Sequence, residues 1–79
     1  MTTAYIRLSN IQDIRNFVEI VSLSEEEVDL SSGRYVVDAK SIMGIFSLDL
    51  LNPIKLTDHS DHAEALMAKL SRFIVDEKA

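Results

Sequence analysis

The sequence contains no cysteine, so neither a disulfide nor a thiolate metal site can stabilise the chain. It has no uninterrupted apolar run that approaches the ~20 residues needed to span a bilayer. Proline occurs only once in the 79 residues. The fold must therefore depend on a packed apolar core, and the hydrophobic content of 47% is sufficient for one.

Positive charge is also scarce. Eight lysines and arginines face thirteen aspartates and glutamates, which gives a net charge of −5. This balance disfavours nucleic acids and anionic membrane surfaces as partners. The first residues lack the basic and apolar regions of a signal peptide. We therefore expect a cytoplasmic protein that forms a single domain over residues 1–79. This length is near the lower limit for a domain that folds without disulfides or a structural metal.

Hydrophobic periodicity predicts seven elements in the order strand, helix, strand, strand, helix, strand, helix. The predicted elements are a strand at 4–8, a helix at 10–23, a hairpin over 28–38, a helix from 41 to about 51, a strand at 54–57 and a last helix whose apolar stripe is Leu66, Met67, Leu70, Phe73 and Ile74. This order favours an α+β fold with helices on one face of a four-stranded, mainly antiparallel sheet. We expect a right-handed crossover between the first two strands.

The second predicted helix contains the most apolar run in the chain. Its spacing places Ile45, Phe46 and Leu48 in the core. Met43, together with Ile42, would then face solvent. Exposed apolar side chains grouped in this way are typical of a contact surface.

Two small residues mark the start of the same helix. Ser41 stands directly before the apolar periodicity, where an N-cap is expected. Gly44 falls in the first turns, where glycine costs about 1 kcal/mol relative to alanine. We therefore expect a packing or contact reason for this glycine.

These residues also carry a resemblance to a known family. The segment Lys40-Ser41-Ile42-Met43-Gly44, followed by Ser47-Leu48, resembles the regulatory-serine segment of HPr, the small phosphocarrier of the bacterial sugar phosphotransferase system. The similarity continues without a gap through 28–30 and 33–38, and more weakly into the flanking helices. The chain is thus identified as HPr-like, and the resemblance implies the open-faced β-sandwich of HPr and its strand order.

The resemblance implies a role for Ser41 as a regulatory phosphorylation site for an HPr-type kinase. It also implies phosphotransferase-system proteins or transcription regulators as partners, which would bind around Lys40, Ile42, Met43, Gly44 and Ser47. A phosphate on Ser41 would add about −2 charge beside Met43 and so change which partner docks. The alternative is that Ser41 is only an N-cap, as most serines before helices are.

The chain departs from HPr at the phosphoryl-transfer site. HPr carries its phosphoryl group on the histidine of a Gly-x-His-Ala-Arg-Pro segment. Carried back without gaps from the serine motif, the histidine falls on Asn10, the arginine on Gln12 and the proline on Asp13. An amide does not accept a phosphoryl group, and Asp13 would repel one. The resemblance therefore implies an adaptor without enzymatic activity or cofactor, a monomer or weak dimer similar in this respect to catabolite-repression HPr.

Two histidines remain, in the segment Asp58-His59-Ser60-Asp61-His62. The favoured interpretation is a polar helix cap with exposed imidazoles. A relocated phosphoryl acceptor is one alternative, although no arginine lies beside either histidine. A metal site is another, since histidines at i and i+3 with flanking carboxylates offer suitable donors. A third role, assembly by strand pairing or swapping, also stays open.

Overall fold

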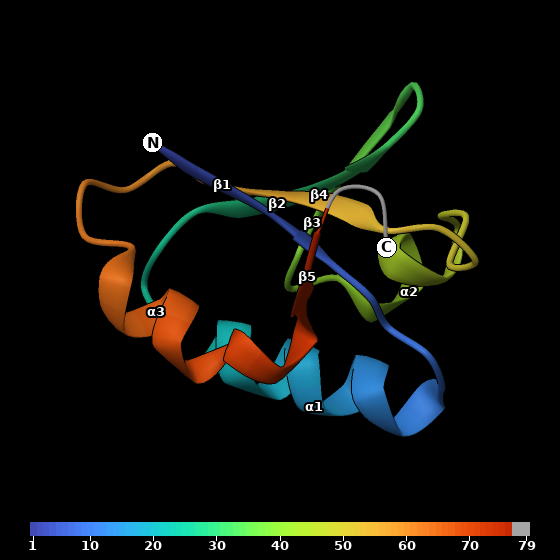
Figure 1. The fold of residues 1–79 in the computed structure, drawn as a ribbon, viewed down its shortest axis with the longest axis horizontal. Coiled ribbons are helices and arrows are strands. Elements are labelled where there is room, and N and C mark those ends of the chain that lie inside the picture. Colours follow the sequence, from blue (N-terminus) through green and yellow to red (C-terminus); the bar gives the residue numbers. More distant parts are fainter. Residues whose placement is uncertain (77–79) are drawn as a thin grey trace.

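The computed structural model describes residues 1–76 and shows a sheet with its helices on one side (Figure 1). Its elements are β1 Thr2–Ile6, α1 Ile11–Ser22, β2 Val28–Ser32, β3 Tyr35–Asp38, α2 Ile42–Phe46, β4 Ile54–Asp58, α3 Glu64–Lys69, the 3₁₀ turn η1 Ser71–Phe73 and β5 Ile74–Val75. The predicted order of the first seven elements is confirmed. No helix in this part of the chain has the length and apolarity to cross a membrane.

The sheet has five strands in the order β3-β2-β4-β1-β5, and every neighbouring pair is antiparallel. The α+β prediction is therefore confirmed, but the predicted count of four strands is wrong by one short strand at the edge. Strands β1 and β2 both pair with β4, so they run parallel to each other. The chain that joins them, which includes α1, is accordingly a crossover.

The pairing register divides the sheet into a buried and an open face. Ile6 pairs with Ile54, and Leu30 pairs with Leu56; all four side chains are buried beneath the helices. The intervening residues point to the other face, where no helix lies, because side chains alternate along a strand. The helices complete the core with the apolar side chains Ile14, Phe17, Val21, Ile45, Leu48, Leu66, Leu70 and Phe73.

Helix α1 begins where the sequence predicts. The Asn10 side chain accepts a hydrogen bond from the backbone of Asp13 at 2.8 Å, and the Asp13 carboxylate accepts one from the backbone N–H of Ser9 at 3.2 Å. This reciprocal arrangement satisfies two backbone donors near the start of the helix. The predicted helix at 10–23 therefore corresponds to α1 with Asn10 as its N-cap and Leu23 as its C-cap.

Helix α2 is shorter than predicted, and one of its core assignments is wrong. It ends at Phe46 rather than near residue 51, and the Phe46 side chain is 45% exposed. Asp49 explains the early end: its carboxylate accepts hydrogen bonds from the Leu51 backbone at 3.0 Å and from the Asn52 amide at 2.9 Å. An aspartate that binds local backbone in this way favours a turn over a helix.

The last predicted helix also ends early. Helix α3 stops at Lys69, and the chain then passes through η1 into β5, whose Ile74 pairs with Ile6 of β1. Leu70 and Phe73 are buried as the apolar stripe predicts, because a spacing of three residues also suits a 3₁₀ turn. The placement of Ile74 in the helix was wrong: it belongs to the fifth strand.

Candidate functional site

The segment that carries the sequence motif forms the start of α2. Ser41 has extended backbone angles, and its hydroxyl oxygen accepts a hydrogen bond from the backbone N–H of Gly44 at 3.1 Å. Ser41 is thus the N-cap that the sequence predicts, and it lies exposed at the surface. The Ser47 hydroxyl donates to the Gly44 carbonyl at 2.6 Å at the other end of α2. Ser47 therefore caps the end of the helix.

Gly44 has a packing reason to be glycine. A Cβ atom at this position would lie 3.0 Å from the Val37 Cβ and 3.2 Å from the Ser41 hydroxyl oxygen. The missing side chain lets α2 lie directly against β3 and leaves room for the Ser41 cap. The contact with Val37 is enough to explain Gly44 without a partner.

Lys40 connects α2 to the end of α1. Its amine donates a hydrogen bond to the Ser24 carbonyl at 3.0 Å, and its backbone N–H donates to the Asp38 carboxylate at 2.8 Å. The side chain is half-buried. Lys40 therefore holds the loop after α1 against the β3–α2 connection, and its amine does not point at the Ser41 hydroxyl.

An exposed apolar surface begins next to Ser41. We call Ser41, Ile42, Met43 and Phe46 the α2 surface. Met43 is 75% exposed, Phe46 is also exposed, and Ile42 is half-buried against the core. The prediction that Met43 faces solvent is confirmed. Several large apolar side chains on one short helix are typical of a protein-binding surface.

The predicted phosphoryl-acceptor position at the start of α1 has no imidazole. Asn10 and Asp13 cap the helix as described above, and the Gln12 amide donates to the Asn16 side-chain oxygen at 3.0 Å. All three side chains make hydrogen bonds within α1 or to its cap. The amides of Asn10 and Gln12 are not nucleophiles for phosphoryl transfer, and the Asp13 carboxylate is engaged by the Ser9 backbone N–H.

The fold brings two arginines to this position that the sequence did not associate with it. Arg7 and Arg72 line a depression of about 220 Å³ together with Ser9 and Asp13. The Arg72 guanidinium lies 4.4 Å from the centre of the Phe73 ring, and Arg7 donates to the Leu51 carbonyl at 3.2 Å. Only the return of the chain through η1 places Arg72 beside β1, so no local motif could have shown it.

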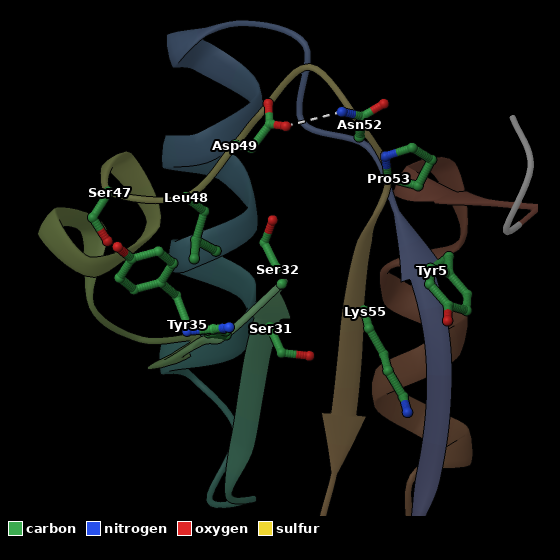
Figure 2. Close-up of a pocket in the computed structure, with 12 residues that line it drawn as sticks. Tyr5, Ser31, Ser32, Tyr35, Ser47, Leu48, Asp49, Asn52, Pro53 and Lys55 are labelled. Atoms are coloured by element: carbon green, nitrogen blue, oxygen red, sulfur yellow. Dashed lines mark hydrogen bonds between the residues drawn. The ribbon is translucent and has the colours of Figure 1, made fainter.

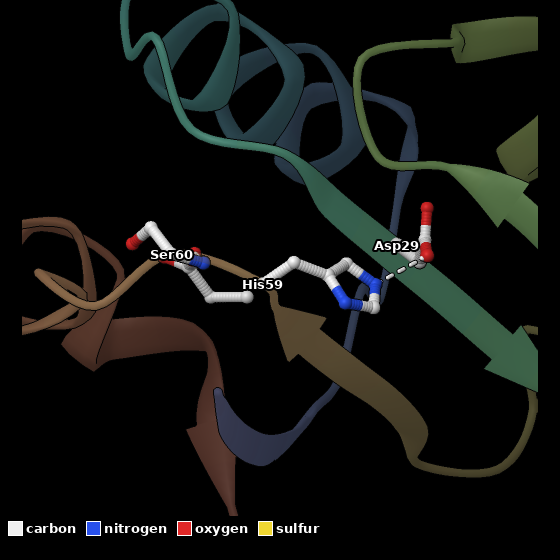
Figure 3. Close-up of polar contacts among 4 residues, drawn as sticks. Asp29, His59 and Ser60 are labelled. Carbon is white, nitrogen blue, oxygen red and sulfur yellow. Dashed lines mark hydrogen bonds and ion pairs between the residues drawn. The ribbon is translucent and has the colours of Figure 1, made fainter.

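The two histidines follow β4, at the opposite end of the sheet from the start of α1. Thr2 pairs with Asp58 at one end of β1, whereas Ile6, which leads to α1, pairs with Ile54 at the other. The His59 Nε2 atom lies 2.7 Å from the Asp29 carboxylate, and both side chains are 40% exposed (Figure 3). His59 is therefore held by β2, while its Nδ1 atom has no hydrogen-bond partner among the described residues.

A carboxyl pair lies beneath His59. Asp58 is fully buried; one of its oxygens accepts from the Ser60 backbone at 2.9 Å, and the other finds no donor among residues 1–76 unless the nearby Glu26 is protonated. The hydrogen bond with Asp58 raises the pKa of Glu26, although the Ser60 hydroxyl opposes this by donating to Glu26 at 2.8 Å. Burial raises the pKa of Asp58, but the hydrogen bonds from Glu26 and Ser60 outweigh it and hold that pKa below its usual value. When Glu26 is protonated, it can donate to the Asp58 oxygen that otherwise lacks a donor.

Neither region forms a metal centre or an enclosed substrate pocket. Within residues 1–76, no three histidine or carboxylate side chains converge so that they could hold a metal ion. An open groove of about 1070 Å³ lies between the β2–β3 hairpin and the loop that leads from α2 to β4. Figure 2 shows its lining, with Tyr35 and Ser47 on one side and Tyr5 and Lys55 on the strands opposite. Its polar lining includes Ser47 and Asp49, but the Ser47 hydroxyl donates to the Gly44 carbonyl and the Asp49 carboxylate accepts from Asn52, so the two are not paired with each other.

Two solved structures have similar folds. HPr-C-His from Thermoanaerobacter tengcongensis is 28% identical, with a TM-score of 0.78 over 91% of this chain and 89% of that chain. The phosphocarrier protein HPr from Bacillus anthracis strain Ames is 22% identical, with a TM-score of 0.73 over 94% of this chain and 96% of that chain. No protein-family model and no curated protein matches the sequence. The resemblance that the serine motif predicts is therefore confirmed: this chain is similar in structure to HPr phosphocarrier proteins.

Proposed function

We propose that this chain is a regulatory adaptor related to the sugar phosphotransferase system. It binds protein partners through the α2 surface, and a phosphate on Ser41 switches that binding. In this proposal the chain does not carry phosphoryl groups on histidine and has no enzymatic activity. Its partners are an HPr-type kinase and proteins of the phosphotransferase system or transcription regulators, and it acts in the cytoplasm.

The observation that carries the loss of histidine transfer is the chemistry at the start of α1. An amide occupies the N-cap, and its oxygen binds the Asp13 backbone. The Asp13 carboxylate adds negative charge where an incoming phosphoryl group would need positive charge. Arg7 and Arg72 beside it could steady an anion, yet they are not acceptors of a phosphoryl group.

Ser41 supports the regulatory half of the proposal because it is exposed and stands two residues before the exposed Met43. A phosphate there would place about −2 charge next to an exposed apolar side chain. A partner that buries Met43 would then have to desolvate or neutralise that charge. Since the Lys40 amine is bound to the Ser24 carbonyl, this chain supplies little compensation of its own. The switch would consequently act on docking and leave the fold intact.

Incubation with an HPr serine kinase and ATP tests the regulatory role. We expect one acid-stable phosphate per chain, located on Ser41 by mass spectrometry. Ser41→Ala should abolish the incorporation. Ser47→Ala is the matched control, because it removes an exposed hydroxyl from the other end of the same helix and should leave the incorporation unchanged. Equal labelling of wild type and Ser41→Ala would refute the serine switch.

One observation favours a second candidate, a phosphocarrier whose acceptor has moved to His59. The 2.7 Å contact with Asp29 orients the ring and leaves Nδ1 open, which is how an activated imidazole is often arranged. The surroundings weigh against it. Glu25, Glu26 and Glu27 line the hollow in front of this histidine, together with His62, and would repel an incoming phosphoryl group.

A further inference from the structure

Strand β3 forms an outer edge of the sheet, and part of its backbone faces solvent. The hydrogen bond from the Ala39 N–H to the Val28 carbonyl, at 2.9 Å, fixes the phase of the β2–β3 ladder. Bonds to β2 therefore come from Tyr35, Val37 and Ala39, because bonded and non-bonded residues alternate in an antiparallel pair. The backbone N–H and C=O groups of Val36 consequently point outward.

Nothing in the described structure covers these groups. The Val36 side chain is 65% exposed, and its backbone has no hydrogen bond outside the strand ladder. Figure 1 shows the β2–β3 hairpin projecting beyond the rest of the molecule, so a neighbouring strand could reach it. An exposed edge with a β-branched residue at its centre and no proline or lysine lacks the usual protection against strand pairing.

The charges on this edge are arranged symmetrically about Val36. Arg34 lies in the turn that leads into β3, two residues before Val36, and Asp38 ends β3 two residues after it. The Arg34 side chain has no hydrogen bond or ion pair with any described residue. Asp38 lies directly opposite Asp29 on β2, and like charges in such a pair are unfavourable.

We propose that β3 pairs with β3 of a second copy of this chain, antiparallel and with Val36 opposite Val36. This register places Arg34 of each copy opposite Asp38 of the other, so two ion pairs form. Each arginine would also offset the unfavourable pair that Asp38 makes with Asp29. Tyr35 would lie opposite Val37 of the other copy, and an aromatic side chain beside a β-branched one is a favourable cross-strand pair.

This pairing joins two five-stranded sheets into one continuous sheet. It does not require the proposed phosphorylation, although the Asp38 carbonyl accepts a hydrogen bond from the Ser41 backbone N–H at 2.9 Å and the two sites are therefore adjacent. Only a few residues from each copy take part, and each copy carries a net charge of −5. His59 partly offsets the Asp29 charge at 2.7 Å, and Lys55 lies further into the same face of the sheet. We therefore expect a weak dimer, with a dissociation constant of about 0.1 to 1 mM.

Sedimentation velocity tests the pairing. The protein concentration is varied from about 10 μM to about 1 mM, a range that includes the expected dissociation constant. We expect wild type to shift from monomer to dimer over this range. Arg34→Asp and Asp38→Arg should each remain monomeric, because each places like charges opposite each other. An equimolar mixture of these two variants should dimerise at least as well as wild type, since both pairs in the mixed dimer are then complementary.

Two further variants separate the edge from a general charge effect. Val36→Lys should abolish the dimer, because two lysines would stand opposite each other at its centre. Leu23→Lys adds the same charge at an exposed site after α1 and should dimerise as wild type does. Circular dichroism should show all variants folded. The proposal would be overturned if wild type stays monomeric at about 1 mM. It would also be overturned if the mixture of Arg34→Asp and Asp38→Arg stays monomeric.

Discussion

Replacing Phe17 by alanine should reduce the free energy of unfolding by about 3–5 kcal/mol. Phe17 is fully buried in the middle of α1, and its ring meets that of Phe73 edge to face, with 5.8 Å between the centroids and 87° between the planes. The substitution leaves a cavity between α1 and η1 and removes the aromatic contact that holds the C-terminal segment. A domain of this size has a total stability of roughly 4–12 kcal/mol, so much of the fold's margin would be lost. Urea denaturation followed by circular dichroism measures the change.

Ile11→Ala provides the matched control for Phe17→Ala. Ile11 is a large apolar residue on the same helix, but it is 59% exposed. Its truncation should change the stability by less than about 0.5 kcal/mol. Equal losses for the two variants would contradict the assignment of Phe17 to the centre of the core.

The second large effect concerns the buried carboxylate. Asp58→Ala should destabilise the protein by about 1–3 kcal/mol at pH 7, because the part-buried Ser60 backbone N–H loses its acceptor. Glu26→Gln should act in the opposite direction. A glutamine amide can donate to the Asp58 oxygen that otherwise lacks a donor, and it can still accept from the Ser60 hydroxyl. Glu25→Gln removes the same charge from an exposed neighbour and serves as the control.

The effect of Glu26→Gln should depend on pH. Because the fold raises the Glu26 pKa above its ordinary value of 4.5, the proton on Glu26 stabilises the fold fully below that value. This contribution is lost as the pH rises through the folded-state pKa. The glutamine amide keeps its protons at every pH tested. The variant should therefore melt a few degrees above wild type at pH 7, and the difference should vanish toward about pH 4, near the usual pKa of a carboxyl group.

The contribution of Asp58 to stability depends on pH in the opposite direction. The fold lowers its pKa below the ordinary value of 3.8, so its contribution is present above that value and is lost as the pH falls through the folded-state pKa. Thermal melts of Asp58→Ala, Glu26→Gln and Glu25→Gln across the acidic and neutral range measure both effects. A Glu26→Gln gain that is the same at every pH would contradict a raised Glu26 pKa.

Much of the fold follows from local patterns in the sequence. The alternation in β1 and β4 and the helical spacing in α1 are strong because one face of each element is buried. Ser41 could be assigned as an N-cap for the same local reason, and that assignment is confirmed. The turn at Gly33 has a positive φ of 60°, which favours glycine and fixes the hairpin.

The errors arose where distant parts of the chain decide the local structure. Ile74 has the spacing of a helix, but pairing with Ile6 makes it a strand. Phe46 looks like a core residue, yet the hydrogen bonds of Asp49 end α2 before a further turn could bury it. In both cases the apolar periodicity is ambiguous over a few residues, and tertiary contacts select the outcome.

In the candidate site, too, local features could be predicted from the sequence and contacts between distant residues could not. The motif places Ser41, Met43 and Gly44 on one short helix, and the structure explains each of them by a cap, an exposed surface and a close contact with Val37. By contrast, the depression beside the start of α1 depends on Arg72, which only the folded chain brings there. The contact between His59 and Asp29 likewise joins residues 30 positions apart and has no sequence signal.

The most direct test of the proposed function is incubation of the protein with phosphoenolpyruvate and the general enzyme of the phosphotransferase system, with an HPr phosphocarrier as positive control. The account predicts acid-labile phosphate on the control and none on this chain, because the proposed alignment with HPr places Asn10 at the position of the acceptor histidine. Acid-labile phosphate on this chain would contradict that claim. Its loss in a His59→Gln variant, but not in His62→Gln, would then assign the transfer to the histidine beside Asp29.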